Sequence, residues 1–341
     1  MTVQEKYLKI VDDVIAKGPY KPDWLTFTDY EAPKWFRNAK FGIFIHWGLF
    51  SVPAFRNEWY SRNMYIQSME EWQHHRDTFG EHTKFGYKDF IPMFTAPKFD
   101  PKAWAKLFKK AGARYVMPVA EHHDGFQMYD SEISDWTVKK MAMKRDVLGE
   151  LKEAIQDEDM IFCESNHRVE HAFFFGHGKE FDSDVKDPMK LGDFYYPSMP
   201  EPDNQDLYSS APPQDFLEDW LARNCELVEK YRPSMVYFDW WIQHESVKPY
   251  LMKFAAYYYN RGLEWNMEVG ISYKHDAMML GTGILDMERG HFSEAKPLAF
   301  PGNTRFRFLP SSGTIVGVRF SKPVRLTTGM ITSVPVISAG V

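Results

Sequence analysis

Cysteine is scarce in this chain of 341 residues: only Cys163 and Cys225 occur, and each lies inside a hydrophobic segment. Two such residues do not form the framework of bridges that holds small secreted domains together, so we interpret both as buried free thiols. A chain of this length can bury a sizeable core without disulfides or structural metals. The sequence therefore predicts one large domain or two ordinary ones, stabilised by burial.

An excess of positive charge and long apolar runs are also missing. The formal net charge is -6, which excludes the basic surface that nucleic acids and anionic membranes attract, so we expect neither as a partner. No stretch of about 18 apolar residues occurs, and the first seven residues, Met-Thr-Val-Gln-Glu-Lys-Tyr, lack the apolar region of a signal peptide. We therefore expect a soluble protein that stays in the cytoplasm.

Aromatic residues, in contrast, are abundant. They make up 16% of the chain and include 11 Trp, 18 Tyr and 27 Phe. Aromatic side chains in such numbers fit an enzyme that stacks sugar rings on flat apolar surfaces. An aromatic-rich core is the alternative, and it accounts for many of these residues.

Short apolar runs alternate with amphipathic segments along most of the chain. The short runs predict buried strands, and apolar residues at helical spacing predict helices. Strands that alternate with helices are typical of α/β proteins with a parallel sheet, and we predict a (β/α)8 TIM-like barrel, with the option that it is incomplete at the carboxyl end. The predicted strands are 40–46, 114–120, 160–164, 234–239, 269–273 and 283–287; the predicted helices are 3–17, 100–112, 145–157, 214–231 and 246–262.

Two regions interrupt this alternation. Residues 165–212 are rich in Gly, Pro, Asp and aromatic residues, so we predict a long loop that lies over the site. After residue 296 the composition changes: no Trp occurs beyond Trp265, and no amphipathic helix is evident. We therefore divide the chain into a catalytic domain, 1–296, and an atypical tail, 297–341, which we expect to pack weakly and to leave an exposed apolar seam.

Polar residues gather where the predicted strands end. The run 114–120 leads directly into Glu121, His122, His123 and Asp124, and Gly125 then allows a close turn. One buried His is more often a hydrogen-bonded core residue than a catalytic one. Two adjacent His followed by Asp-Gly favour a functional site, because the carboxyl ends of barrel strands are where sites are assembled.

Two carboxylates extend this pattern. Asp239 lies between Phe238 and Trp240 at the end of an apolar strand, where a carboxylate must be hydrogen-bonded, paired or functional. Glu288 ends a later strand, and the adjacent Arg289 offers a purely structural ion pair as the alternative. Paired carboxylates above His and Trp side chains are what glycoside hydrolysis requires: one acts as a nucleophile and the other as an acid.

The combined motifs resemble a known family. Four segments are similar to the catalytic domain of the retaining α-L-fucosidases of glycoside hydrolase family 29. They are Lys40-Phe-Gly-Ile-Phe-Ile-His-Trp-Gly48, Glu58-Trp-Tyr60, the Glu-His-His-Asp-Gly-Phe core that ends at Phe126, and Tyr237-Phe-Asp239. The resemblance covers roughly residues 25–295. It implies an exo-acting α-L-fucosidase that hydrolyses terminal fucosyl residues of oligosaccharides or glycoconjugates without a cofactor or metal.

The resemblance also assigns roles to residues. It implies that Asp239 is the nucleophile, with Glu288 as the best candidate for the acid and base and Glu294 as the fallback. The residues that it places around the fucose are His46, Glu58, Trp59, His122, His123 and Tyr237.

The tail departs from the family. Members commonly continue into a β-sandwich domain and carry a Trp-Gln pair and a second Trp near the end of the barrel, and this chain has neither feature. Codons for Pro301-Gly-Asn-Thr304 can spell Trp-Gln-Tyr in another reading frame. We therefore hypothesise that residues 297–341 are a frameshifted reading of the end of the barrel.

Two other functions remain open at the level of the sequence. A metal-dependent hydrolase would use His46, His122, His123 and Asp239 to bind zinc, although adjacent His on a strand point to opposite faces. A catalytically inactive fucose-binding protein would bind the sugar without turnover, and the atypical tail favours this alternative.

Overall fold

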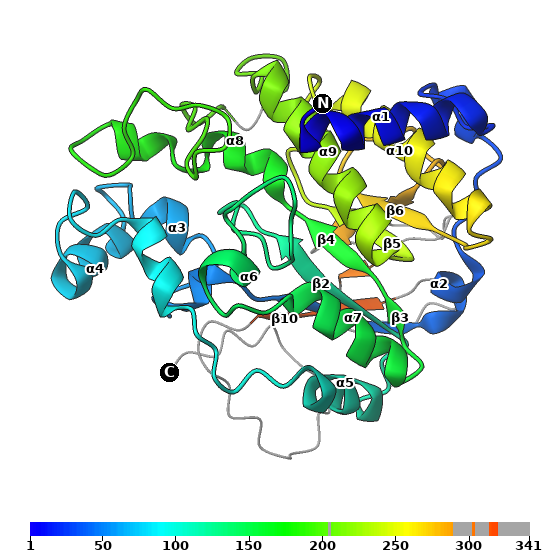
Figure 1. Ribbon diagram of the computed structural model, residues 1–341, viewed down its shortest axis with the longest axis horizontal. Coiled ribbons are helices and arrows are strands. Elements are labelled where there is room, and N and C mark those ends of the chain that lie inside the picture. The colour runs from blue at the N-terminus through cyan, green and yellow to red at the C-terminus, as the bar shows by residue number, and fades with distance from the viewer. Residues whose placement is uncertain (204–205, 289–301, 304–313, 320–341) are drawn as a thin grey trace.

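The computed structural model describes residues 1–203, 206–288, 302–303 and 314–319, with side chains up to Asp286. Parallel strands alternate with helices through most of this part (Figure 1). The strands are β1 Phe41–His46, β2 Tyr115–Glu121, β3 Ile161–Phe162, β4 Glu164–Asn166, β5 Met235–Phe238, β6 Gly270–Tyr273, β7 Ile284–Leu285, β8 Met287–Glu288, β9 Gly302–Asn303 and β10 Thr314–Arg319. The α-helices are α1 Val3–Lys17, α2 Lys34–Ala39, α3 Tyr60–Asn63, α4 Glu70–Phe79, α5 Pro101–Lys110, α6 Val138–Met141, α7 Val147–Asp157, α8 His171–Phe174, α9 Gln214–Tyr231 and α10 Lys248–Glu264. The 3-10 helices are η1 Trp24–Phe27, η2 Leu49–Ser51, η3 Tyr87–Met93, η4 Arg168–Glu170 and η5 Gly176–Lys179.

The strands form one curled parallel sheet. Its order is β7-β6-β5-β4-β2-β1-β10-β9-β8, and β3 pairs with β2 beside this path. The strands at the two ends of the order, β7 and β8, are separated in the chain by Asp286 alone, so the sheet curls back on itself. This topology confirms the predicted fold class: a TIM-like (β/α)8 sheet, here as an incomplete barrel.

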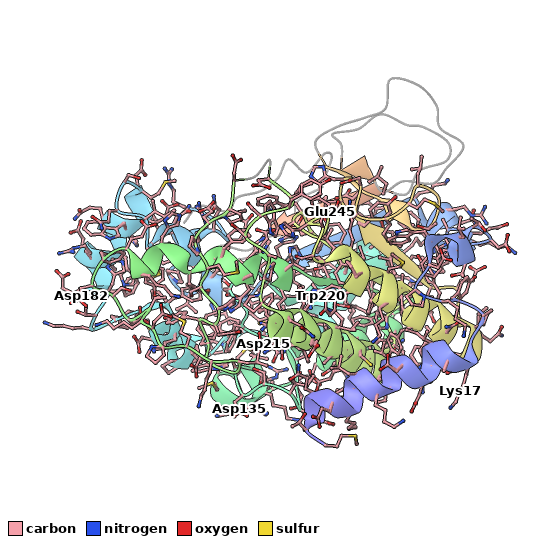
Figure 2. The ribbon with its side chains drawn as sticks, turned by 90° about the horizontal axis from the view of Figure 1, so that it is seen from above. Lys17, Asp135, Asp182, Asp215, Trp220 and Glu245 are labelled. Carbon is pink, nitrogen blue, oxygen red and sulfur yellow. The ribbon has the colours of Figure 1, made fainter. Side chains whose placement is uncertain are left out.

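Helices cover the outside of this sheet in two groups. Helices α1, α9 and α10 pack together, and Val11, Trp220 and Phe254 lie in their common apolar cluster. Figure 2 shows α1, which ends at Lys17, alongside α9, the helix that carries Asp215 and Trp220. Helices α5 and α7 pack together elsewhere on the sheet, and α7 contacts β2 and β3. The buried faces of these helices hold the strands whose ends form the site.

Local sequence signals define the helix ends. The Thr2 hydroxyl accepts a hydrogen bond from the backbone N–H of Glu5, and the Glu5 carboxylate accepts one from the backbone N–H of Thr2, so α1 begins with a capping box. Asp100 accepts a bond from the backbone N–H of Ala103, with Pro101 as the first helical residue of α5. The predicted helices 3–17 and 214–231 are confirmed at both ends, and the other three are confirmed within a few residues.

One prediction requires correction, and the tail adds a feature that was not predicted. Residues 165–212 are not a plain loop, because β4 extends to Asn166 and the short helices η4, α8 and η5 follow. The tail also supplies two strands, and β10 pairs with β1 along all six of its residues. The β-branched residues Thr, Ile and Val in β10 favour an extended strand. From the sequence, only helices were considered in this segment, so the strand was not predicted.

The remaining tail predictions lie outside the described residues. Weak packing, an apolar seam and a frameshifted ending were expected for segments that include 289–301, 304–313 and 320–341. These segments are not described by the structure, so the three expectations stay predictions. Both cysteines are buried and free, as predicted. No helix in the described ranges is long and apolar enough to cross a membrane.

Candidate active site

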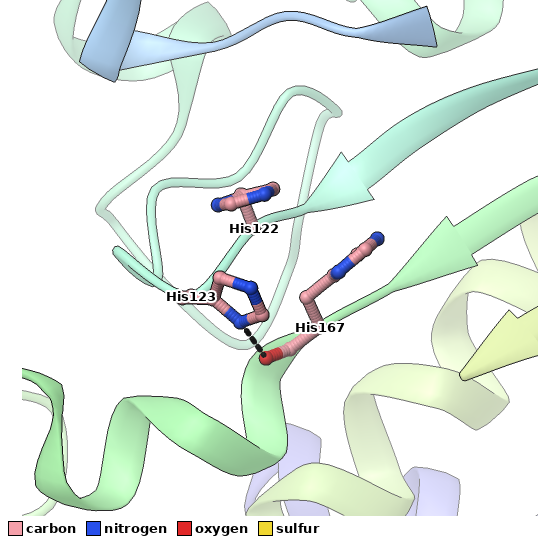
Figure 3. Close-up of side chains that lie close together, drawn as sticks. All are labelled: His122, His123 and His167. Atoms are coloured by element: carbon pink, nitrogen blue, oxygen red, sulfur yellow. Dashed lines mark hydrogen bonds between the residues drawn. The ribbon is translucent and has the colours of Figure 1, made fainter. Parts of the chain in front are cut away.

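Four histidines meet beyond the carboxyl ends of three neighbouring strands. His46 ends β1, His122 and His123 follow β2, and His167 follows β4. Their rings are close: the centroid of His122 lies 4.2 Å from that of His123 and 4.8 Å from that of His167, and His46 lies 5.2 Å from His167. Figure 3 shows His122, His123 and His167 lying close together, with Nδ1 of His123 donating to the backbone oxygen of His167 at 3.2 Å.

Asp239 follows β5 and faces this cluster. Its Oδ2 accepts a hydrogen bond from Nδ1 of His167 at 3.0 Å and lies 3.7 Å from Nε2 of His123. Its Oδ1 lies 3.8 Å from the ammonium nitrogen of Lys274. The Asp239 side chain is 17% exposed, whereas those of His123 and His167 are only 3% and 1% exposed. Asp239 is therefore the carboxylate of this cluster that solvent can reach.

The charges around Asp239 keep it ionised. Burial acts to raise the pKa of Asp239, but the hydrogen bond from His167 and the positive charges of His167, Lys274 and His123 outweigh burial, so the pKa lies well below its usual range. A carboxylate that is anionic, held from several sides and partly exposed has the properties of a nucleophile.

Tyr237 and Asp286 complete the support of Asp239. The hydroxyl of Tyr237 lies 3.3 Å from Oδ1 of Asp239 and 3.0 Å from Oδ2 of Asp286. Lys274 pairs with Asp286 at 2.7 Å. Tyr237 is only 3% exposed, so it lies beneath the carboxylate of Asp239 and not at an open surface.

Aromatic rings lie on the other side of the cluster. The ring of Trp59 lies 5.5 Å from His123 and 5.3 Å from Phe174, and it stacks at 6.5 Å with Trp240, the residue after Asp239. Trp59 is half-buried, so it combines a fixed position with an accessible face. Flat aromatic surfaces of this kind suit the apolar face of a sugar.

The turn after His123 is fixed by close packing. Gly125 has a φ of 73°, a conformation that residues with a side chain rarely adopt, and a Cβ there would lie 2.5 Å from the ring of His171. The carboxyl of Asp124 accepts hydrogen bonds from the hydroxyl of Tyr87 and the backbone N–H of Phe126. The predicted turn is present, and it holds the two histidines at the end of β2.

The structure brings most of the predicted site residues together. One cluster contains six of them: His46, Trp59, His122, His123, Tyr237 and Asp239. Glu58 is buried and directly precedes Trp59 in the chain. Only the backbone of Glu288 is described, in β8, and its side chain lies outside the described part of the chain, as does Glu294. Their predicted roles stay predictions.

Sequence reasoning missed four members of this cluster: His167, Glu170, Lys274 and Asp286. Each follows directly after a strand or lies within four residues of its end, which is the same signal that identified His46 and Asp239. His167 and Glu170 were hidden in a segment interpreted as a loop. Lys274 follows a strand that was predicted correctly. Asp286 lies inside the predicted strand 283–287, which the structure divides into β7 and β8 on either side of it.

A metal ion is the competing interpretation of this cluster. Among the described residues, the sets His122, His123, His167 and His123, Glu170, Asp239 each offer ligand atoms within 4.8 Å of one another. However, Nδ1 of His167 donates to Asp239, and its Nε2 lies 3.1 Å from the hydroxyl of Ser165. A metal would have to displace one of these partners, because a nitrogen that carries a proton has no lone pair for a ligand bond. The first set, which contains His167, thus suits hydrogen bonding better than metal ligation.

Comparisons with known proteins agree with this geometry. The family model described as alpha-L-fucosidase matches residues 8–300. Tissue alpha-L-fucosidase of Rattus norvegicus is 32% identical over 242 residues, which cover 69% of this chain and 49% of that protein. The Homo sapiens protein of the same name is 33% identical over 231 residues, which cover 67% and 47%. The chain thus spans about half the length of these relatives.

Solved structures give the same family. The crystal structure of Thermotoga maritima alpha-fucosidase in complex with fucose matches with a TM-score of 0.66 and 30% identity. The match covers 83% of this chain and 61% of that one.

Proposed function

Because this chain belongs to the alpha-L-fucosidase family, we propose that it hydrolyses terminal α-L-fucosyl residues of glycans, with retention of configuration at the anomeric carbon. The observation that carries the proposal is Asp239, an anionic carboxylate held by His167, His123 and Lys274 beside aromatic rings. Fucosylated oligosaccharides or glycoconjugates are the substrate class, in keeping with the fucose complex of the Thermotoga relative.

The mechanism proceeds in two displacements. Asp239 attacks the anomeric carbon and forms a glycosyl ester, while an acid protonates the departing glycosidic oxygen. Water, deprotonated by the same acid residue in its basic form, then cleaves the ester and releases fucose. The hydrogen bond from His167 keeps Asp239 anionic and oriented before the attack, and Trp59 offers its ring to the sugar. Glu288 is our candidate for the acid and base.

The direct test is an assay of the full chain with an aryl α-L-fucoside, run beside aryl β-D-galactoside, α-D-glucoside and β-D-glucoside. We expect release of the aryl alcohol from the fucoside alone. Equal or greater hydrolysis of another glycoside would contradict the assignment. Chelator treatment before the assay should leave the rate unchanged, whereas a metal-dependent hydrolase would lose activity.

The alternative, a catalytically inactive fucose-binding protein, predicts a different result in the same experiment. It would bind fucose in calorimetry and release no aryl alcohol. Detection of turnover that disappears in the Asp239→Ala variant excludes it.

A further inference from the structure

The ring of Trp59, which the proposed function places against the sugar, has a charged neighbour. The guanidinium carbon of Arg62, three residues further along the chain in α3, lies 5.6 Å from the centre of the Trp59 ring. A guanidinium within about 6 Å of an aromatic centroid is attracted by the electron-rich ring, and the attraction grows as water is excluded. The Arg62 side chain is only 14% exposed, so this contact is partly shielded from water.

Glu201 fixes the guanidinium of Arg62 in this position. Nε of Arg62 donates to Oε2 of Glu201 at 3.0 Å, and Nη2 donates to the same oxygen. Oε2 also accepts a hydrogen bond of 2.7 Å from Nε2 of His177, which lies in η5. Burial acts to raise the pKa of Glu201, but the hydrogen bonds from His177 and Arg62 outweigh burial, so the pKa lies below its ordinary value and the group is a carboxylate. Arg62 is thereby joined to a segment 139 positions further along the chain.

The backbone of Trp59 is held independently of the Arg62 side chain. Its N–H donates to the side chain of Asn57 at 2.9 Å, and its carbonyl oxygen accepts bonds from the backbone N–H groups of Arg62 and Asn63. Loss of the guanidinium leaves these bonds in place. The guanidinium therefore acts on the orientation of the indole ring, which the backbone bonds do not determine.

We propose that Arg62 is a positioning residue, anchored by Glu201, that holds the Trp59 ring in the orientation in which it packs against the sugar. This inference rests on the proposed function. Packing against a ring acts on the bound sugar before and during the reaction alike, so its loss weakens binding and leaves the chemical step nearly unchanged. The signature of this role is a higher KM at nearly constant kcat.

The test compares variants of the full chain. Arg62→Met removes the charge and keeps a long side chain, and Glu201→Gln removes the charge of the anchor. Each is also made in a Trp59→Leu background, which lacks the ring through which the proposed effect passes. Circular dichroism establishes that each variant is folded, and Glu201→Gln carries the same readouts if Arg62→Met does not fold.

A matched control has the same chemistry at another tryptophan. The guanidinium carbon of Arg76 lies 4.6 Å from the ring centre of Trp72, and Arg76 pairs with Glu81. The ring of Trp72 contacts those of His82 and Phe181, which are not members of the active-site cluster. Arg76→Met therefore removes an equivalent cation from a tryptophan that takes no part in the proposed reaction.

The main readout is the separation of KM from kcat for an aryl α-L-fucoside. Arg62→Met should raise KM about 3- to 30-fold, the factor that loss of a partly buried cation–π contact allows, and kcat should change by less than about 2-fold. Glu201→Gln should raise KM by a smaller factor, and Arg76→Met should change neither constant. In the Trp59→Leu background, Arg62→Met should have no further effect on KM. An equal rise of KM in that background would overturn the proposal, as would a fall of kcat at constant KM.

A second measurement does not need turnover. In protein labelled with fluorotryptophan, the ¹⁹F resonance of Trp59 is identified by its absence from Trp59→Leu. It should shift and broaden in Arg62→Met and stay unchanged in Arg76→Met; an unchanged resonance in Arg62→Met would contradict the proposal. If the unmodified chain does not cleave the fucoside, the proposed function fails by itself, and the resonance still decides whether Arg62 orients the ring.

Discussion

We predict that the buried carboxyl group of Glu164 lowers the free energy of unfolding at neutral pH. It is fully buried in β4, and neither of its carboxyl oxygens has a hydrogen-bond partner among the described residues. Burial, followed by the negative charge of Glu121, raises the pKa of Glu164 from its ordinary value of 4.5 to about 8. The folded protein therefore holds this proton more tightly than the unfolded chain does.

The sign of the pH dependence follows from that difference. Below pH 4.5 the carboxyl is neutral in both states and costs nothing extra, and the free energy of unfolding then falls as the pH rises toward 8. At about 1.4 kcal/mol per pH unit, the loss at pH 7 is roughly 3 kcal/mol. The Glu164→Gln variant is neutral at every pH, so it should be more stable than the unmodified chain at pH 7 by up to that amount and equally stable near pH 4.5.

Urea unfolding at several pH values between 4.5 and 8, followed by circular dichroism, measures this difference. Glu153→Gln, a substitution at an exposed position of the neighbouring helix α7, is the control and should leave the pH dependence unchanged. A Glu164→Gln variant with the same slope of stability against pH as the unmodified chain would refute the reasoning.

Three further predictions concern the site and its support. Asp239→Gly should abolish turnover but retain fucose binding, and azide should restore part of the rate by filling the vacated space; loss of fucose binding would argue against a nucleophile. Arg168→Met breaks two buried ion pairs of 2.7 and 2.8 Å and should cost about 3–5 kcal/mol of unfolding free energy, whereas Lys139→Met at an exposed pair should cost less than about 1 kcal/mol in the same urea experiment. Glu288→Ala should slow fucosides with poor leaving groups more than activated aryl fucosides, and equal slowing would move the acid role to Glu294.

The fold was largely predictable because burial leaves a periodic signal. Strand β2 is buried at every position and is an apolar run up to its last residue, Glu121, and helix α9 carries apolar residues at helical spacing. Strand β4 was predicted too short, since its last residues, Ser165 and Asn166, are polar side chains that are nevertheless buried. Strand β10 pairs with β1, far away in the sequence, and no local pattern announces such a partner.

The site was predictable only where polar residues interrupt strong apolar runs. His122, His123 and Asp239 follow such runs and were found. Glu170 was not found, because it joins the cluster only through its proximity to His123, 47 positions earlier, which the folded chain creates. Arg168 was missed for the same reason: its partners Glu121 and Asp219 come from β2 and α9.

The central claim is that Asp239 forms a covalent bond with the sugar. Incubation of the full chain with 2-fluoro-fucosyl fluoride should slow the second displacement more than the first, so that the glycosyl ester accumulates. Mass spectrometry of the peptides should then show one added 2-fluoro-fucosyl group on the peptide that contains Asp239, and none after Asp239→Asn. A label on a different carboxyl, or an active enzyme that is never labelled, would contradict the account.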